Sequence, residues 1–216
     1  MDASKARGWV LEPDAKKIMA DTGLDIPNFV LTSDTDAAAG FLDQLQGPVV
    51  AKAVSGQILH KTEHKAVVTH IHDPEYLKNE MTRLLSLPGC DQVLVEEMVT
   101  GIEVMLGSKN DSQFGPVILL GLGGTAVEIY NDTAIRLAPV STGDVDSMVD
   151  SLTAAPLFKG HRGQAGVNME ALRECVVSFS QLVMALESWY ESIDLNPVIC
   201  GPEKCVVADA RIMLFK

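Results

Sequence analysis

Hydrophobic residues recur at helical spacing in several segments of this chain. From Leu11 to Thr22 they fall every three or four positions, which is typical of a helix with one buried side, and Gly23 is suited to end that helix. An aspartate followed by proline at Asp73-Pro74 marks the start of another helix. The pattern as a whole predicts helices over residues 11–22, 33–45, 73–85, 142–152 and 168–186.

Shorter apolar runs between these segments indicate strands. Residues 67–72 alternate between apolar and polar, as in a strand with one buried face. Residues 114–120 form a continuous apolar run, which indicates a buried strand. The remaining strands are predicted over 92–95, 125–130, 135–139, 193–199 and 205–211. We find no internal repeat and no flexible linker between these elements.

Composition and charge disfavour several classes of function. The chain has 216 residues, 47% of them hydrophobic, which suffices for one large domain or two lobes with a buried core. Its formal net charge of −12 disfavours a surface that binds nucleic acid. No apolar run approaches the roughly 18 residues of a membrane helix. The N-terminus lacks the apolar core of a signal peptide, so we expect a cytoplasmic protein that binds no membrane.

The four cysteines show no spacing typical of a metal site. Cys90, Cys175, Cys200 and Cys205 include no Cys-x-x-Cys pair. Cys200 and Cys205 flank a Gly-Pro turn, so they could lie across a hairpin. In a cytosolic protein we expect free, buried thiols.

A positive charge lies in the middle of the apolar run that begins at Pro48. A charge in a buried strand needs a partner, which can be a bound ligand, and Lys52 is such a charge. Ser55 and Gly56 end the strand, and the polar loop that follows holds two histidines and two lysines within residues 60–65. The segment is therefore either an anion-binding site or an edge-strand lysine followed by a solvated loop.

The sequence of this loop resembles a known phosphate-binding loop. Ser-Gly-Gln-Ile-Leu-His-Lys-Thr-Glu, residues 55–63, is similar to the signature of the nucleotide-binding subunit of ADP-forming acyl-CoA synthetases, which are ATP-grasp proteins related to succinyl-CoA synthetase. Phe-Gly-Pro, Gly-Leu-Gly-Gly with Val-Glu, Ile-Arg-Leu-Ala-Pro and a Gly-His-Arg-Gly turn follow in the family's order. The resemblance implies an α+β ATP-grasp fold, with two lobes (residues 1–97 and 98–216) that hold a Mg-nucleotide between their sheets.

The resemblance also implies nucleotide-binding roles for individual residues. Lys52 and Ser55 fall where the family binds phosphates, and a lysine can neutralise phosphate oxygens as a point charge. Glu96 to Met98 match the join between lobes, which presents backbone groups to the adenine edge. Glu103 matches the carboxylate that accepts hydrogen bonds from the ribose hydroxyls. Without the resemblance, this segment is simply an acidic turn between two strands.

His60 matches the histidine that carries phosphate at the nucleotide site of this family. A neutral imidazole suits that role because it is a competent nucleophile near neutral pH. The chain departs from the family pattern just after this residue. Where the family has two glycines, Lys65 and Ala66 follow Glu63 and His64. Their loss removes conformational freedom from the loop and lowers the expected efficiency of phosphate transfer.

A predicted hairpin near the C-terminus carries a candidate metal site. The strands 193–199 and 205–211 can place Asn196 and Asp209 side by side. Asp194 shares a face with Asn196, because strand side chains repeat every second residue. An amide oxygen and a carboxylate suit Mg²⁺, which completes its coordination with water and phosphate oxygens. The alternative is an ordinary hairpin with Asn and Asp near its turn, but Asp-x-Asn-Pro followed by a strand with Asp resembles the family's metal-binding pair.

Together these matches imply the ATP/ADP-binding subunit of an ADP-forming acyl-CoA synthetase of the acetate–CoA ligase type. Such a subunit transfers phosphate between ADP or ATP and a phosphohistidine or acyl phosphate. Because the chain offers no candidate CoA-binding segment, we expect a CoA-binding α subunit as its partner, in a heterotetramer.

Two alternatives from other classes remain at this stage. One is a non-catalytic, nucleotide-sensing ATP-grasp module of an acyltransferase-type protein, which the missing loop glycines favour. The other is an ATP-dependent carboxylate–amine ligase, which shares the fold but does not need His60. The residues do not indicate the acyl group, because its pocket would lie in the partner.

Overall fold

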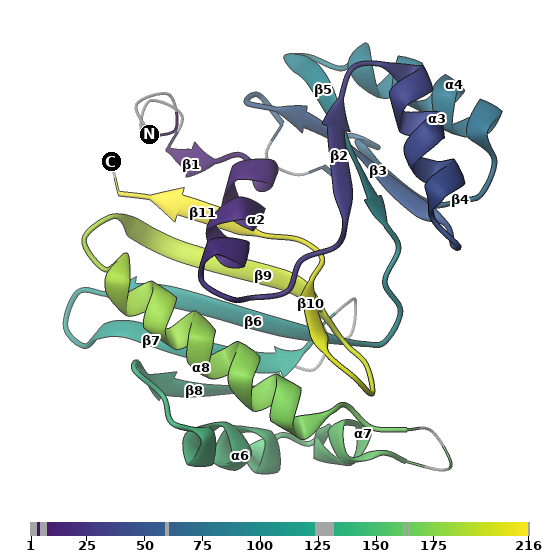
Figure 1. The fold of residues 1–216 in the computed structure, drawn as a ribbon. Coiled ribbons are helices and arrows are strands. Elements are labelled where there is room, and N and C mark those ends of the chain that lie inside the picture. The colour runs from purple at the N-terminus through teal and green to yellow at the C-terminus, as the bar shows by residue number, and fades with distance from the viewer. Residues whose placement is uncertain are drawn as a thin grey trace. The chain divides into compact units, whose positions relative to one another are not determined.

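Helices and strands of the chain belong to two units, each built around its own sheet (Figure 1). The computed structural model describes Ser4 and residues 8–58, 61–123, 132–161, 163 and 165–215. The larger unit comprises Met1–Ile26 and Val99–Lys216, and the smaller unit comprises Pro27–Met98. Each unit has a separate hydrophobic core. Among the described residues, no helix is both long and apolar enough to cross a membrane.

The smaller unit is a four-stranded antiparallel sheet with two helices packed on one face. In chain order its elements are β2 (Phe29–Thr32), α3 (Thr35–Gln44), β3 (Val49–Ser55), β4 (Val67–Ile71), α4 (Pro74–Leu85) and β5 (Cys90–Glu97), and the strand order is β2-β5-β3-β4. Asp34 and Asp73 cap the two helices by accepting hydrogen bonds from backbone N–H groups of the first turn. The predicted cap of the first helix was Ser33, so the structure corrects that start by one residue.

The larger unit is a seven-stranded antiparallel sheet with helices on one face (Figure 1). Its elements are β1 (Trp9–Val10), α2 (Glu12–Asp21), β6 (Ile102–Asp111), β7 (Gly115–Leu122), β8 (Thr133–Leu137), α6 (Thr142–Ser151), α7 (Ala155–Lys159), α8 (Met169–Ala185), β9 (Tyr190–Cys200), β10 (Cys205–Val207) and β11 (Arg211–Leu214). The strand order is β1-β11-β9-β6-β7-β8, and β10 pairs with β9.

One face of the large sheet forms the core with α2, α6 and α8. Leu106, Ile118 and Leu195 belong to the same buried cluster as Met148 on α6 and Phe179 on α8. Because side chains alternate along a strand, the intervening residues lie on the opposite face. We call this opposite face, which carries Glu103, Asp194, Asn196 and Arg211, the second face of the large sheet.

The two units differ from the predicted lobes at the N-terminus. We expected residues 1–97 in one lobe, but the first 26 residues belong with Val99–Lys216. The reason is that β1 pairs with β11, with Trp9 opposite Met213, while Ala15 and Met19 of α2 lie in the large core. A two-residue strand leaves almost no pattern in a sequence, and its partner lies at the other end of the chain.

The cysteines also differ from expectation. Cys200 and Cys205 lie opposite each other in the β9–β10 ladder and form a disulfide, so the prediction of free thiols is wrong for this pair. Cys90 and Cys175 are free and buried. Burial raises the pKa of the Cys175 thiol to about 12, which keeps it in the unreactive protonated form.

Candidate functional site

Four polar residues of β9, β11 and the segment before β11 lie on the second face of the large sheet. Asp194 and Asn196 alternate with Ile193 and Leu195, which are buried in the core. Arg211 is directly opposite Asp194 in the β9–β11 ladder, and its Nη2 donates a hydrogen bond to Asp194 Oδ2 at 3.0 Å. The fourth residue is Asp209.

A β-bulge interrupts β9 at Asn196 and Pro197. Val104 pairs with Val198, but Leu106 pairs with Leu195, so Asn196 and Pro197 together lie opposite one residue of β6. The extra residue breaks the alternation of side chains along β9. Leu195 before the bulge and Val198 after it are three residues apart, yet both face the core. As a result Asn196 and, further along, Ile199 both lie on the second face. No feature of the hydrophobic pattern showed this bulge.

Asp209 lies in a break between two strands, next to the bulge. The backbone N–H groups of Ala208 and Asp209 both donate to the carbonyl of Pro197, at 3.0 and 3.3 Å. We predicted a continuous return strand over 205–211, but the structure divides it into β10 and β11. The shared carbonyl replaces the regular ladder there and holds Asp209 beside Asn196.

The charges around this cluster influence one another. Burial raises the pKa of the Asp194 carboxyl above its usual value, the Arg211 charge and hydrogen bond lower it, and the nearby Asp209 carboxylate raises it again. Asp194 therefore lies close enough to Asp209 for their charges to interact. The ion pair with Arg211 supplies the compensating positive charge.

Asn196 and Asp209 fit the ligand preferences of Mg²⁺. One amide oxygen and one carboxylate are an adequate protein contribution for a magnesium ion that also binds phosphate oxygens and water. Within the described residues, no group of three or more His, Cys, Asp or Glu side chains is placed to hold a metal ion. Two oxygen donors would leave most positions of an octahedral magnesium ion to other ligands.

Glu103 occupies the same face as this pair. Its side chain is exposed on β6, directly opposite Ile199 in the ladder. Its carbonyl accepts a hydrogen bond from the N–H of Gly123 at 2.7 Å. A Cβ on Gly123 would meet the Glu103 backbone at 3.0 Å, a tight contact, so the missing side chain eases the close approach of these two segments.

In the smaller unit, Lys52 is paired with Glu96. The two residues are diagonal neighbours on β3 and β5, and the distance between Lys52 Nζ and Glu96 Oε1 is 2.5 Å. Both side chains are almost fully buried, with 6% and 2% of the residue surface exposed. The partner that the sequence required for Lys52 is therefore a neighbouring carboxylate, and sequence reasoning did not identify Glu96 in this role.

Comparison with known proteins decides the family. A family model described as "ATP-grasp domain" matches residues 2–214. The chain belongs to the ATP-grasp family. Two relatives are the β subunits of ADP-forming acetate–CoA ligases I and II of Pyrococcus furiosus. They are 33% and 34% identical, over 95% and 98% of this chain and 91% and 94% of their own lengths.

Solved structures give the same ATP-grasp fold. The dinucleotide-forming acetyl-coenzyme A synthetase 1 of Candidatus Korarchaeum cryptofilum, in complex with coenzyme A, Ca-AMPCP and HgCl⁺, matches with a TM-score of 0.89 and 31% identity, covering 99% of this chain and 97% of that chain. Its complex with coenzyme A and Mg-AMPPCP matches with a TM-score of 0.84 and 30% identity, covering 99% and 96%. The expected α+β ATP-grasp fold is confirmed.

The predicted join of this ATP-grasp protein has its amide groups engaged within the smaller unit. The N–H of Glu97 donates to the carbonyl of Asn28 at 3.0 Å, and that of Met98 donates to Pro48 at 2.9 Å. The Glu97 carboxylate accepts from the Asn28 backbone and side-chain nitrogens at 3.1 and 3.0 Å. These bonds fix the course of the chain where β5 ends.

The phosphate-loop residues are only partly described. The hydroxyl of Ser55 donates to the carbonyl of Pro88 at 2.7 Å and accepts from the N–H of Gln57 at 3.0 Å, so it holds the start of the loop in place. His60, the predicted phosphate carrier, lies outside the described residues. Lys65 has a positive φ of 50°, a conformation in which glycine is favoured.

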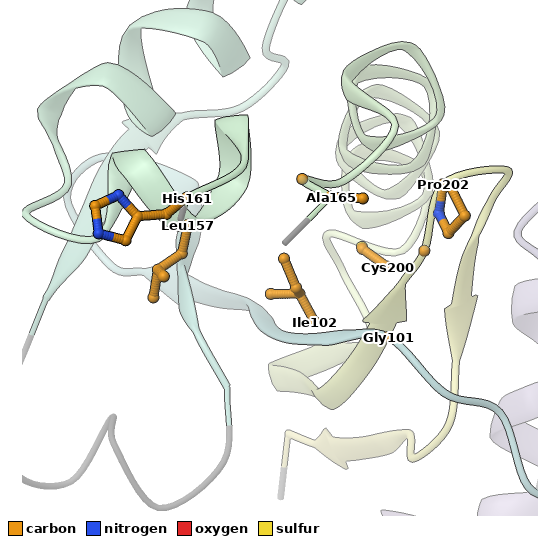
Figure 2. A pocket seen from close by; sticks show the side chains of 9 residues that line it. Gly101, Ile102, Leu157, His161, Ala165, Cys200 and Pro202 are labelled. Atoms are coloured by element: carbon orange, nitrogen blue, oxygen red, sulfur yellow. The ribbon is translucent and has the colours of Figure 1, made fainter. Parts of the chain in front are cut away.

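A cavity of about 370 Å³ lies elsewhere in the larger unit. Figure 2 shows Leu157 and His161 on one side, Cys200 and Pro202 on the other, and Ile102 between them. Because β6 and β9 alternate, Ile102 and Cys200 point to the core side of the sheet, away from the face that carries Glu103. The cavity is therefore distinct from the cluster around Asn196. The Gly-His-Arg-Gly turn contributes His161, but the sequence did not reveal the cavity.

Proposed function

We propose that this chain is the nucleotide-binding β subunit of an ADP-forming acyl-CoA synthetase. The observation that carries the proposal is the hydrogen bond from the Asp209 N–H to the carbonyl of Pro197, the residue after Asn196, in a chain similar to acetate–CoA ligase β subunits along almost its whole length. Both relatives are named as subunits, which supports a partner. That partner would be a CoA-binding α subunit, in a heterotetramer, and the complex would work in the cytoplasm.

Residues of the smaller unit would bind the phosphates and the adenine. Lys52 would neutralise phosphate oxygens, and Glu96 would hold its ammonium group in a fixed place until a nucleotide binds. Backbone groups near Met98 would contact the adenine edge. Ser55 would contribute through the backbone of its loop, since its hydroxyl already bridges Pro88 and Gln57.

Residues of the larger unit would bind the ribose and the metal ion. The exposed Glu103 carboxylate would accept hydrogen bonds from the ribose hydroxyls. Asn196 and Asp209 would hold Mg²⁺, which offsets the charge between the β- and γ-phosphates when it is bound. Their oxygen donors are suited to that ion, and a related synthetase structure contains Mg-AMPPCP.

His60 would carry phosphate between the partner and ADP. In the ATP-forming direction, the N–P bond of the phosphohistidine breaks and a P–O bond to a terminal oxygen of ADP forms. The imidazole leaves with the electron pair of the N–P bond and takes up a proton, which returns it to its starting state. Histidine suits this exchange because its neutral form is nucleophilic near neutral pH.

The backbone at Lys65 weakens the case for a non-catalytic nucleotide sensor. That alternative rested on the loss of two loop glycines. Lys65, however, adopts the left-handed conformation that a glycine takes without strain, and the carbonyl of this residue accepts a hydrogen bond from Arg83 Nη1 at 2.9 Å. A loop can thus keep the glycine-like backbone here with a lysine, whose charge adds to the positive site.

Calorimetry and an activity assay test this function together. The isolated chain should bind ADP in the presence of Mg²⁺, and Asp209→Ala should weaken this binding strongly, whereas the exposed Asp43→Ala on α3 should not. Acyl-CoA synthesis should appear only after the CoA-binding partner is added. Equal Mg-dependent affinity of wild type and Asp209→Ala would remove the metal site, and turnover by this chain alone would refute the division between subunits.

A further inference from the structure

An arginine–aspartate pair lies immediately beside the proposed metal ligands. Arg211 and Asp194 face each other across β11 and β9, and Nη2 of the arginine donates to Oδ2 of the aspartate at 3.0 Å. Their side chains are 38% and 37% exposed, so the pair is accessible from the second face of the large sheet. A guanidinium has five N–H donors, and the bond to Asp194 uses one of them.

The pair has a defined position along β9 relative to the other proposed site residues. Glu103 is opposite Ile199, Asn196 precedes Ile199 by three residues, and Asp194 precedes it by five. At roughly 3.3 Å per residue, these offsets are about 10 Å and about 17 Å along the strand. The order on this face is therefore the ribose carboxylate, then the metal pair, then Arg211 with Asp194. A nucleotide with its ribose at Glu103 and its Mg²⁺ at Asn196 and Asp209 would extend its phosphates in this direction.

Arg211 supplies positive charge beside the two aspartates of this cluster. Asp194 and Asp209 contribute two negative charges close together. Bound Mg²⁺ would balance those two charges and leave no excess for the phosphates. With Arg211 added, the two aspartates, Arg211 and a bound Mg²⁺ sum to +1, which favours phosphate oxygens at this part of the face.

We propose that Arg211 contacts the phosphoryl group that is transferred, and that Asp194 is a positioning residue that holds the guanidinium toward it. This inference rests on the proposed function. Arg211 presents two parallel N–H groups that match phosphate geometry, which a lysine cannot do. Asp194 fixes the rotamer of this long side chain before the ligand arrives, so less conformational entropy is lost on binding.

Calorimetry with two ligands tests the proposal. The intact chain, with Mg²⁺ present, is titrated with ADP and with an ATP analogue that has a methylene group between the β- and γ-phosphates. Arg211→Ala should weaken binding of the analogue about 10- to 100-fold, as expected for lost hydrogen bonds to a charged group. Binding of ADP, which lacks the terminal phosphoryl group, should change far less.

Three further variants separate a phosphate contact from a structural role. Arg211→Lys keeps the charge without the fork, so its affinity for the analogue should lie between those of wild type and Arg211→Ala. Asp194→Asn should lower affinity for the analogue relative to ADP while the unfolding midpoint stays close to that of wild type. Arg173→Ala is the control, because it removes a similar pair between α8 and α6 in which Arg173 Nε donates to Asp146 Oδ1 at 2.8 Å. This variant should bind ADP and the analogue as tightly as wild type.

The outcomes distinguish failure of this inference from failure of the proposed function. If Arg211→Ala binds the analogue like wild type while Asp209→Ala loses Mg-dependent binding, the nucleotide site stands and the role of Arg211 is wrong. Equal losses for ADP and the analogue, with a lowered unfolding midpoint, would also overturn it, because they indicate a purely structural ion pair. A wild-type chain that binds neither ligand with Mg²⁺ would overturn the proposed function itself.

Discussion

Lys65 adopts a backbone conformation that is unusual for a residue with a side chain. Its φ is 50°, and its N–H donates to the carbonyl of Thr62 at 3.1 Å within a tight turn. The next residue, Ala66, is fully buried in the core of the smaller unit, and its N–H donates to the carbonyl of Lys61 at 2.8 Å. Thus one of the two positions, Lys65, requires a left-handed backbone, whereas the other, Ala66, places a small side chain in the core.

Glycine substitutions at these two positions should have opposite effects on stability. Lys65→Gly removes a left-handed residue that costs about 1–2 kcal/mol, offset by the extra chain entropy of glycine at about 0.5–1 kcal/mol. The free energy of unfolding should therefore rise by about 0–1.5 kcal/mol. Ala66→Gly deletes a buried methyl group and gives the unfolded chain the same extra entropy. The free energy of unfolding of this variant should therefore fall by about 1–2 kcal/mol. Denaturant unfolding measures both, and destabilisation by Lys65→Gly would contradict the observed strain.

Removing the carboxylate of Glu96 should strongly destabilise the chain. Glu96→Gln leaves the buried ammonium group of Lys52 without this counter-charge, and breaking a buried ion pair from one side costs about 3–5 kcal/mol. Urea denaturation measures the loss. Asp36→Asn is the matched control, since it breaks a pair with Lys78 Nζ at 2.7 Å whose aspartate is exposed, and it should leave the curve nearly unchanged. Similar losses for both variants would show that burial of the Lys52 pair is unimportant.

At the scale of elements, α6 begins with a reciprocal pair of cap interactions. The N–H of Asp144 donates to Ser141 Oγ, and the Asp144 carboxylate accepts from the N–H and the hydroxyl of Ser141 at 2.8 and 2.6 Å. These bonds to the charged form hold the pKa of the Asp144 carboxyl below its ordinary value of 3.8. The carboxylate half of this cap therefore stabilises the helix only while the carboxyl is ionised.

The contribution of this cap should disappear in acid. Asp144→Ala should lower the unfolding midpoint at neutral pH, because the folded state favours the ionised carboxylate. The stabilisation is complete above pH 3.8, the ordinary pKa that the Asp144 carboxyl has in the unfolded chain. It is lost as the pH falls through the lower pKa of this carboxyl in the folded protein. Thermal unfolding of both proteins across this range should therefore show the two midpoints converging in acid. Asp150→Ala, near the end of the same helix, should change the neutral midpoint less, and a gap that persists in strong acid would contradict the argument.

At the scale of the whole molecule, the proposed function requires phosphate to pass through His60. In the assembled enzyme, His60→Ala should abolish turnover, because it removes the nucleophilic nitrogen, while Mg-dependent nucleotide binding should fall only modestly. His64→Ala is the matched control in the same loop and should keep most activity. Acid-labile phosphate, located by peptide mapping after incubation with the partner and acetyl phosphate, should appear on His60. Label on His64, or near-normal turnover of His60→Ala, would instead favour a regulatory module.

The sequence alone was sufficient for the longer helices and the family. Helices such as Glu12–Asp21, Pro74–Leu85 and Met169–Ala185 follow from side-chain spacing and from caps within a few residues, including Asn168 before the last of them. The motif order led to the ATP-grasp family, which the match over residues 2–214 confirms. These features could be predicted because helix periodicity and caps depend on neighbours in the chain, and motifs are contiguous.

Only the tertiary structure decided which distant residues act together. The β-bulge at Asn196 and Pro197, the ion pair between Lys52 and Glu96, and the pairing of Arg211 with Asp194 depend on strand register. The inclusion of the first 26 residues in the larger unit depends on a two-residue strand whose partner is at the opposite end of the chain. Register is set by packing over a whole sheet, so no local pattern carries it. One extra residue in a strand changes the face of every side chain beyond it, and here that change puts Ile199, the residue opposite Glu103, on the same face as Asn196.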